Sequence, residues 1–337
     1  MTPAPTPAPP PAPTTAAHDG RHARDGQRTR ANLLLALTAA IWGFGFVAQR
    51  LGADHMGAMS FNAARFAIGA VSMLPLIWWF GRVRRRAVVA YPEPPAGPAV
   101  TPRAVDRQAP WIPGALTGLV IFTAASLQQV GIASTTAGKA GFITGLYIVL
   151  VPVLGLALGH RATAAVWVGL VLAVPGLYLL SMTEDLTIAT GDLLVLVGAF
   201  FWAAHILVID HFVKTVDALQ LSAMQFASCA LLSLAAALVV EEIPFAGLGP
   251  ALGAVLYGGL LAVGLAYTLQ VVAQRHAKAS HAAMLLSLEA VFGALGGWLL
   301  LQETMSPRML LGCALMMAGI MVSLRGTEVQ ADAPPQT

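Results

Sequence analysis

The sequence contains little charge. Only 10% of its 337 residues are Asp, Glu, Lys or Arg, whereas 57% are hydrophobic and the mean hydropathy is +0.73. A soluble fold of this length cannot hide so much apolar surface, so the composition predicts an integral membrane protein. Lys and Arg exceed Asp and Glu only slightly, 19 against 16, and they lie mostly between apolar stretches. We therefore read them as signals of membrane topology and expect no nucleic-acid partner.

Cysteine and enzyme motifs are scarce too. The two cysteines, Cys229 and Cys313, both stand in apolar stretches, which excludes a disulfide framework and gives no metal-binding pattern. The chain has no GxSxG or HExxH motif and no acidic run with metal or phosphate spacing. His205, Asp210 and His211 are close in sequence, but Asp210 and His211 are predicted at the edge of the membrane. We expect no cofactor, no metal and no catalytic residue, and an intramembrane enzyme is the least favoured hypothesis.

What the chain does contain is a series of ten apolar stretches, and we predict an all-α membrane protein of ten transmembrane helices. The predicted spans are 31–49, 57–80, 111–133, 137–159, 163–181, 191–209, 217–240, 247–273, 281–301 and 306–324.

The segments outside these spans are polar or rich in proline. Residues 1–30 have no apolar core like that of a secretion signal, so we expect a disordered cytoplasmic tail. Residues 81–110 form a basic, Pro-rich linker and 325–337 a second cytoplasmic tail. The two five-helix units are then 31–181 and 191–324.

The distribution of basic residues predicts the orientation. If the N-terminus is cytoplasmic, most Lys and Arg residues fall in cytoplasmic segments, and only Arg50, Lys139 and Arg308 fall in loops on the other side. Cytoplasmic loops are enriched in Lys and Arg, so both termini are expected in the cytoplasm of a bacterial inner membrane.

The chain also repeats itself. Trp42 of span one and Trp202 of span six are 160 residues apart, and the same offset places Arg65 on Gln225. Later the offset is 143, which places Thr144 on Ser287. Each unit has five spans, an odd number, so the second unit must enter from the opposite side of the membrane. Inverted repeats of this kind are typical of transporters with a central substrate site.

One carboxylate, Glu289, stands well inside an apolar span. A charge at bilayer depth costs about 2.5–3.5 kcal/mol even on insertion scales, so Glu289 is expected to face protein or water. It could carry a proton, balance a cationic substrate, or donate as a neutral acid to a neighbouring helix. Gly293, Gly296 and Gly297 follow it and form a small-residue face that allows close helix packing.

Other polar and aromatic residues within the spans have a functional and a structural interpretation. Arg65 could bind a substrate carboxylate, but snorkelling or a contact to a helix end is favoured. His205 could relay protons or form a hydrogen bond between helices. Trp42 and Trp202 could line a ligand site or simply pack.

Polar stripes at helical spacing complete the candidate set, and they fit either a water-lined cavity or hydrogen bonds between helices. Tyr267 and Gln270 form one stripe, Thr144 and Tyr147 a second, and Gln129 ends a third that begins at Thr123. The predicted substrate and proton pathway is Glu289, His205, Trp42, Trp202, Tyr147, Thr144, Tyr267, Gln270, Gln129, Ser287 and Arg65.

Short motifs in these spans resemble the bacterial EamA-type exporters of the drug/metabolite transporter superfamily. The motifs are Trp42-Gly43, Arg65-Phe66, Gly141-Phe142-Ile143-Thr144-Gly145-Leu146-Tyr147, Leu288-Glu289-Ala290-Val291 and Gln302-Glu303-Thr304. The resemblance implies export of a small metabolite, such as an amino acid, an amine or a drug-like cation, usually in exchange for protons. The family often has proline after the span-nine glutamate, where this chain has Ala290, and an acid after span four, where it has His160-Arg161.

We therefore expect a secondary active transporter that is embedded in the lipid bilayer and exports a small molecule by alternating access. A passive facilitator of the same fold is the alternative. A homodimer and the identity of the substrate are left open.

Overall fold

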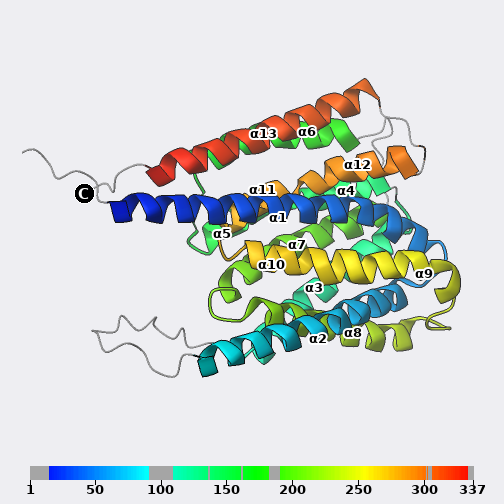
Figure 1. Cartoon of the computed structure of the whole chain (residues 1–337). Coiled ribbons are helices and arrows are strands. Elements are labelled where there is room, and N and C mark those ends of the chain that lie inside the picture. Colours follow the sequence, from blue (N-terminus) through cyan, green and yellow to red (C-terminus); the bar gives the residue numbers. More distant parts are fainter. Residues whose placement is uncertain are drawn as a thin grey trace, which may run out of the picture.

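The computed structural model of the chain describes residues 15–90, 109–135, 137–160, 162–181, 190–300, 302 and 306–332. Within these residues the regular structure is helical, and the helices lie side by side (Figure 1). The helices are α1 (Thr15–Ala53), α2 (Ala58–Ala90), α3 (Trp111–Ile132), α4 (Ala137–Gly145), α5 (Tyr147–Ala157), α6 (Ala164–Ser181), α7 (Thr190–Phe212), α8 (Ala218–Val240), α9 (Leu248–Leu256), the π-helix η1 (Tyr257–Tyr267), α10 (Thr268–Ala273), α11 (Ala279–Leu286), α12 (Leu288–Leu300) and α13 (Pro307–Asp332).

Eight helical segments among the described residues are long and apolar enough to cross a bilayer. Two further apolar helices, Ala164–Leu179 and Pro307–Ser323, are shorter. Each of the ten stretches that the sequence marks as apolar therefore contains helix among the described residues, which confirms an all-α membrane protein.

Several helices extend beyond the predicted spans. Helix α1 begins at Thr15, within the expected tail, and α2 continues to Ala90, within the expected linker. Helix α13 likewise continues past Arg325 to Asp332. These extensions contain no proline, so nothing in them forces the helix to end. The Pro-rich remainders, 1–14, 91–108 and 333–337, lie outside the described residues.

Three predicted spans are interrupted. The break between α4 and α5 lies at Leu146, with φ −61° and ψ −14°, and the break between α11 and α12 lies at Ser287, with φ −62° and ψ −13°. Between α9 and α10 the backbone forms the wider π-helix η1. The break at Ser287 occurs although the chain has Ala290 where the exporters that it resembles often have proline. Interrupted helices and π-helical segments are common at functional sites.

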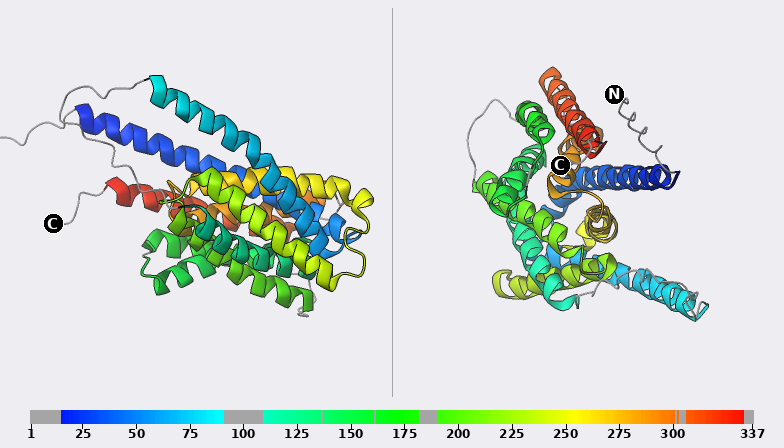
Figure 2. Two further views of the ribbon diagram at one scale, coloured as in Figure 1. Left: turned by 90° about the horizontal axis from the view of Figure 1, so that it is seen from below. Right: turned by 90° about the vertical axis from the view of Figure 1, so that its left-hand side faces the viewer.

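Small residues set the closest helix contacts. Helix α6 packs along α13 at one edge of the molecule, where a Cβ on Gly169 would lie 2.7 Å from the Gly319 carbonyl oxygen (Figure 2). A Cβ on Gly319 would in turn lie 2.5 Å from the Gly169 carbonyl oxygen. The two backbones can approach this closely only because both residues lack side chains.

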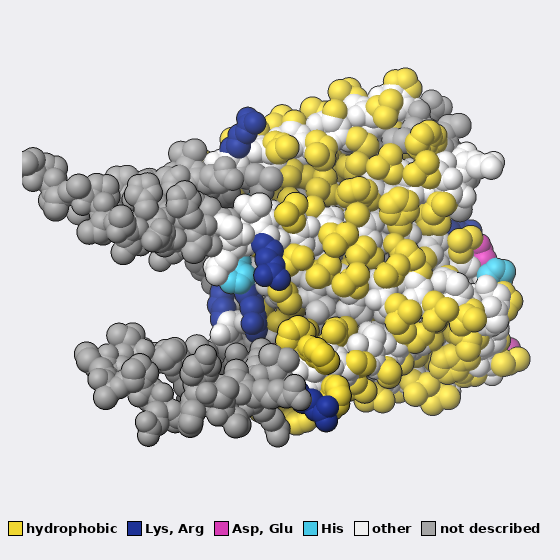
Figure 3. All heavy atoms as spheres, in the orientation of Figure 1, with side chains coloured by type: hydrophobic (Ala, Val, Ile, Leu, Met, Phe, Trp, Pro, Cys, Tyr) yellow, Lys and Arg dark blue, Asp and Glu magenta, His cyan; other side chains and the backbone are white. Residues whose placement is uncertain are grey.

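The surface is apolar between two polar ends. Leucine, valine and tryptophan side chains such as Val71, Trp79 and Leu299 are exposed along the sides of the bundle. Figure 3 shows this apolar belt, with most of the Lys and Arg side chains in view at the end where α1 begins. Acidic side chains are visible at the other end. This is the surface of a protein whose sides face lipid.

Candidate functional site

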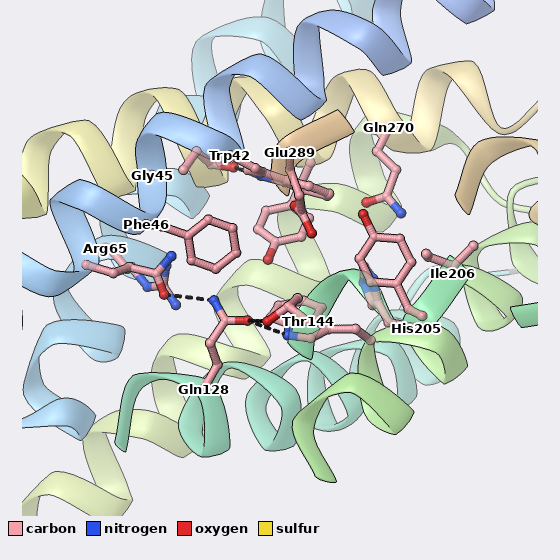
Figure 4. Close-up of a pocket in the computed structure, with 15 residues that line it drawn as sticks. Trp42, Gly45, Phe46, Arg65, Gln128, Thr144, His205, Ile206, Gln270 and Glu289 are labelled. Carbon is pink, nitrogen blue, oxygen red and sulfur yellow. Dashed lines mark hydrogen bonds between the residues drawn. The ribbon is translucent and has the colours of Figure 1, made fainter. Parts of the chain in front are cut away.

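A cavity lies in the middle of the bundle, where both halves of the chain contribute to its wall. Its volume is about 40 Å³, which holds a few water molecules and is too small for a metabolite. Figure 4 shows side chains from several helices converging on it. The lining residues are Trp42, Gly45, Phe46, Gln49, Arg65, Gln128, Thr144, Tyr147, Trp202, His205, Ile206, Ala262, Tyr267, Gln270 and Glu289.

Glu289 reaches the cavity because the helix is interrupted directly before it. Ser287 Oγ donates to the Met284 carbonyl oxygen at 2.7 Å, and α12 then starts afresh, with Glu289 in its first turn. The partial positive charge of a helix N-terminus favours a carboxylate at this position. Glu289 is only 3% exposed, so its carboxyl group is held among protein atoms at membrane depth.

Behind Glu289, α1 and α12 touch backbone to backbone. A Cβ on Gly43 would lie 2.7 Å from the Glu289 carbonyl oxygen, 2.7 Å from Gly293 N and 2.4 Å from Phe292 Cβ. The small residues of the motifs around Gly43 and Gly293 therefore bring the two helices together and fix the backbone that carries Glu289.

A hydrogen-bonded network around Gln128 forms the wall of the cavity opposite Glu289. Gln128 Nε2 donates to Gln49 Oε1 at 2.9 Å. Gln128 Oε1 accepts from Trp202 Nε1 at 2.7 Å and from Thr144 Oγ1 at 3.2 Å. One amide thus links α1, α3, α4 and α7. Because these groups already bind one another, they are better suited to positioning the wall than to holding a solute.

Tyr267 is the centre of an aromatic cluster. Trp42 from the first half lies 4.5 Å from it between ring centroids, and Trp202 from the second half stacks on it at 6.0 Å. The indole of Trp42 is fixed by donating to the Ala262 carbonyl oxygen at 3.0 Å. The two tryptophans related by the 160-residue offset therefore share one partner, which the sequence did not predict.

His205 lines the cavity and also makes a contact between helices. Its Nε2 lies 2.9 Å from Gln225 Oε1 of α8, and its ring meets Tyr267 edge to face at 5.9 Å. The structural and functional interpretations of His205 are therefore compatible.

Several polar atoms of the lining have no hydrogen-bond partner among the described residues. They are Arg65 Nη2, the Tyr147 hydroxyl, both amide atoms of Gln270, and Glu289 Oε1. Of these, the Tyr147 hydroxyl and the Glu289 carboxyl group are neighbours that interact with each other. Buried polar groups in proteins are nearly always hydrogen-bonded. Four such side chains, delivered by α2, α5, α10 and α12, surround this one cavity, which makes it the candidate site for a small solute.

Two predicted residues lie outside the lining. Gln129 donates instead to the Gln49 carbonyl oxygen at 3.1 Å, and Ser287 binds its own helix. The neighbour Gln128 lines the cavity in place of Gln129, because the stripe expected from Thr123 to Gln129 is turned away by about 100°, one residue of helical rotation. Gln49 and the apolar lining residues were not predicted from the sequence. The apolar residues carry no polar signal of their own.

The fold is that of a multi-pass membrane protein, and the comparison with known proteins identifies a transporter. The model of the EamA-like transporter family matches the chain twice, over residues 29–182 and 189–325. The chain belongs to this family.

Similar proteins support the assignment. An uncharacterized transporter of Archaeoglobus fulgidus is 31% identical over 89% of this chain and 87% of its own. The uncharacterized transporters YwfM and YoaV of Bacillus subtilis are 30% and 24% identical, over 86% and 84% of this chain and 92% of each relative. A solved crystal structure has the same fold, with a TM-score of 0.68 over 90% of this chain and 99% of the other, at 17% identity.

Proposed function

We propose that the protein is a secondary active transporter that exports a small metabolite in exchange for protons through the central cavity. The observation that carries this proposal is the set of buried polar atoms without protein partners around Glu289. They come from helices of both halves, which is where a transporter of this kind binds its substrate.

In this proposal, Glu289 binds either a proton or the substrate. A carboxyl group at membrane depth is expensive to keep charged, so it favours a proton or a cationic group beside it. On one side of the membrane, a proton that binds Glu289 would displace the substrate. On the other side, the substrate would displace that proton. The hydrogen-bonded network around Gln128 and the aromatic cluster around Tyr267 would hold the helices of the cavity wall in position.

The ten helices are proposed to form two inverted five-helix units, 31–181 and 191–324. Two observations support this. The breaks at Leu146 and Ser287, in corresponding spans, have nearly the same backbone angles. The packing pattern also recurs: α3 packs on α7 and α8, and η1, its counterpart, packs on α1 and α2. Rocking of one unit against the other would widen the narrow cavity toward each side in turn.

The proposed orientation places both termini in the cytoplasm and the protein in the inner membrane. The gathering of Lys and Arg at one end of the molecule supports it, because positive residues favour the cytoplasmic side (Figure 3).

The test is flux through purified protein in liposomes that carry an imposed pH gradient. A pH-sensitive dye inside the liposomes would record proton movement as amino acids, amines and drug-like cations are added one at a time. The proposal predicts that at least one solute collapses the gradient faster than protein-free liposomes allow. If radiolabelled solute exchanges across the membrane but no solute moves protons, the protein is a passive facilitator and the proposal is wrong.

A further inference from the structure

The described residues also form a groove between the last part of α2 and the first turn of α8, at the end of the bundle where Lys and Arg gather (Figures 1 and 3). Its volume is about 560 Å³, which is far larger than the central cavity and lies within the range of about 300–1,000 Å³ that is typical of ligand sites. The residues that line this α2–α8 groove are Ile77, Trp78, Phe80, Gly81, Arg82, Asp217, Leu219 and Gln220.

The α2–α8 groove follows a proline. Pro75 lies inside α2, and the part of α2 that lines the groove begins directly after it, at Ile77. Proline inside a helix removes one backbone hydrogen bond and crowds the preceding turn, so it bends the helix. In Figure 2 the end of α2 points away from the bundle. The groove therefore lies where α2 leaves the side of α8.

The sequence around the groove places it at the level of the lipid headgroups. The run Trp78-Trp79-Phe80 is exposed on the side of the bundle. Arg82 follows it, and residues 84–86 are all arginine. Tryptophan is enriched at the boundary between membrane and water, and basic residues just outside a span attract anionic lipids. In the bilayer, a lipid headgroup therefore lies beside the groove.

Arg82 gives the groove a positive charge. Its Cζ atom lies 3.7 Å from the centroid of the Trp78 ring, so the guanidinium stacks on the indole. Arg82 takes part in neither of the ion pairs seen between described side chains, Arg50–Asp54 and Lys214–Asp210. Stacking fixes the plane of the guanidinium and leaves its N–H groups at the rim, where they can donate to an anion.

The acid in the lining, Asp217, serves the end of α8. Its side chain is buried, and its Oδ1 accepts from Leu219 N at 3.1 Å and from Gln220 N at 3.4 Å. Asp217 is therefore the N-cap of α8. The exposed polar side chains of the groove are Arg82 and Gln220, and both can donate hydrogen bonds.

We propose that the α2–α8 groove binds the headgroup of one anionic phospholipid, with the phosphate on Arg82 and the chains along the apolar side of the bundle. A guanidinium matches two phosphate oxygens at once. A choline headgroup would bring a second cation beside Arg82, and the face of Trp78 that could hold it is already covered by the guanidinium. The bound lipid would contact α2 of the first half and α8 of the second. This site lies outside the central cavity and does not depend on the proposed transport function.

Native mass spectrometry of the purified protein tests the inference, because it resolves bound lipids by their mass. The protein in detergent would be titrated with palmitoyl-oleoyl phosphatidylglycerol and with the phosphatidylcholine that has the same chains. The wild type should bind the first phosphatidylglycerol about 10-fold more tightly than the first phosphatidylcholine, which is the effect of one charged hydrogen-bonded contact. Glycerophosphoglycerol, the same headgroup without chains, should not displace the bound lipid.

Variants on both helices locate the site. Arg82→Gln should lose most of the preference for phosphatidylglycerol. Gln220→Glu places a negative charge in the groove, so it should weaken phosphatidylglycerol and leave phosphatidylcholine unchanged. Both positions are exposed, and the variants should unfold at the wild-type temperature. Arg308→Gln is the matched control: Arg308 also lies over a ring, that of Tyr178 at 5.6 Å, but it is at the other end of the bundle and should keep the preference (Figure 1).

Four results would overturn the inference. The first is equal binding of the two lipids by the wild type. The second is an unchanged preference in both Arg82→Gln and Gln220→Glu protein. The third is an equal loss of preference in Arg308→Gln and Arg82→Gln, because the preference would then follow the net charge of the protein. The fourth is full displacement of phosphatidylglycerol by glycerophosphoglycerol, which would indicate a site for soluble phosphodiesters.

Discussion

Gly43→Ala is expected to destabilise the protein, because the new methyl group has no space. It would meet two backbone atoms, the Glu289 carbonyl oxygen and Gly293 N, each at 2.7 Å, as well as Phe292 Cβ at 2.4 Å. Backbone atoms cannot rotate away, so α1 and α12 must move apart. Overpacking of this kind costs about 1–3 kcal/mol.

Gly45→Ala is the matched control, two residues along the same helix. Its methyl group would meet only Tyr257 Cε1 at 3.9 Å and Ala262 Cβ at 4.0 Å, which are ordinary contacts. Alanine in a helix is favoured over glycine by about 0.5–1 kcal/mol, so this variant should be as stable as the wild type or more so.

The measurement is the thermal unfolding midpoint of both purified variants in one detergent. A loss of about 2 kcal/mol should lower the midpoint for Gly43→Ala by about 5 °C, whereas Gly45→Ala should not lower it. Equal midpoints for the two variants would refute the close contact between α1 and α12, and with it the way in which Glu289 is held.

Two further substitutions test the framework of the site and the end of the bundle. Gln128→Leu should lower the free energy of unfolding by about 1–3 kcal/mol for each buried group left unpaired, because the indole N–H of Trp202 loses its acceptor. Thermal unfolding in detergent measures this loss, and an unchanged midpoint would contradict the hydrogen-bonded network around Gln128. Glu241→Ala should cost about 0.5–2 kcal/mol, because Glu241 Oε1 accepts from Met59 N at 2.8 Å and Ser60 N at 3.1 Å at the start of α2. The exposed neighbour Glu242→Ala should change stability by less than about 0.5 kcal/mol, and similar losses in both variants would argue against the cap.

The sequence predicted the features whose burial is costly. A carboxylate in an apolar stretch needs protein or water around it, so Glu289 could be identified from its position alone. The helical positions followed from hydropathy, and Trp42 and Trp202 from the repeat. Arg65 was identified with a structural role favoured, and the structure places its side chain in the lining of the cavity.

The features that the sequence could not predict depend on the rotation of each helix about its axis and on its packing against other helices. Gln128 and Gln129 are adjacent and chemically identical, and only the packing of α3 decides which one enters the cavity. The break at Ser287 arises without proline, and the π-helix η1 has no proline at all. The segments beside both features pack on helices that are distant in sequence, η1 on α1 and α2 and α12 on α1.

Proton and solute movement measured together in liposomes containing Glu289→Gln tests the central claim most directly. Glutamine has almost the same shape but cannot release a proton, so the variant should fold, retain some solute exchange and move no protons in response to solute. Glu242→Gln, changed at an exposed acid, should behave as the wild type. Solute-driven proton movement at the wild-type rate in folded Glu289→Gln protein would contradict the role of Glu289 as the proton carrier.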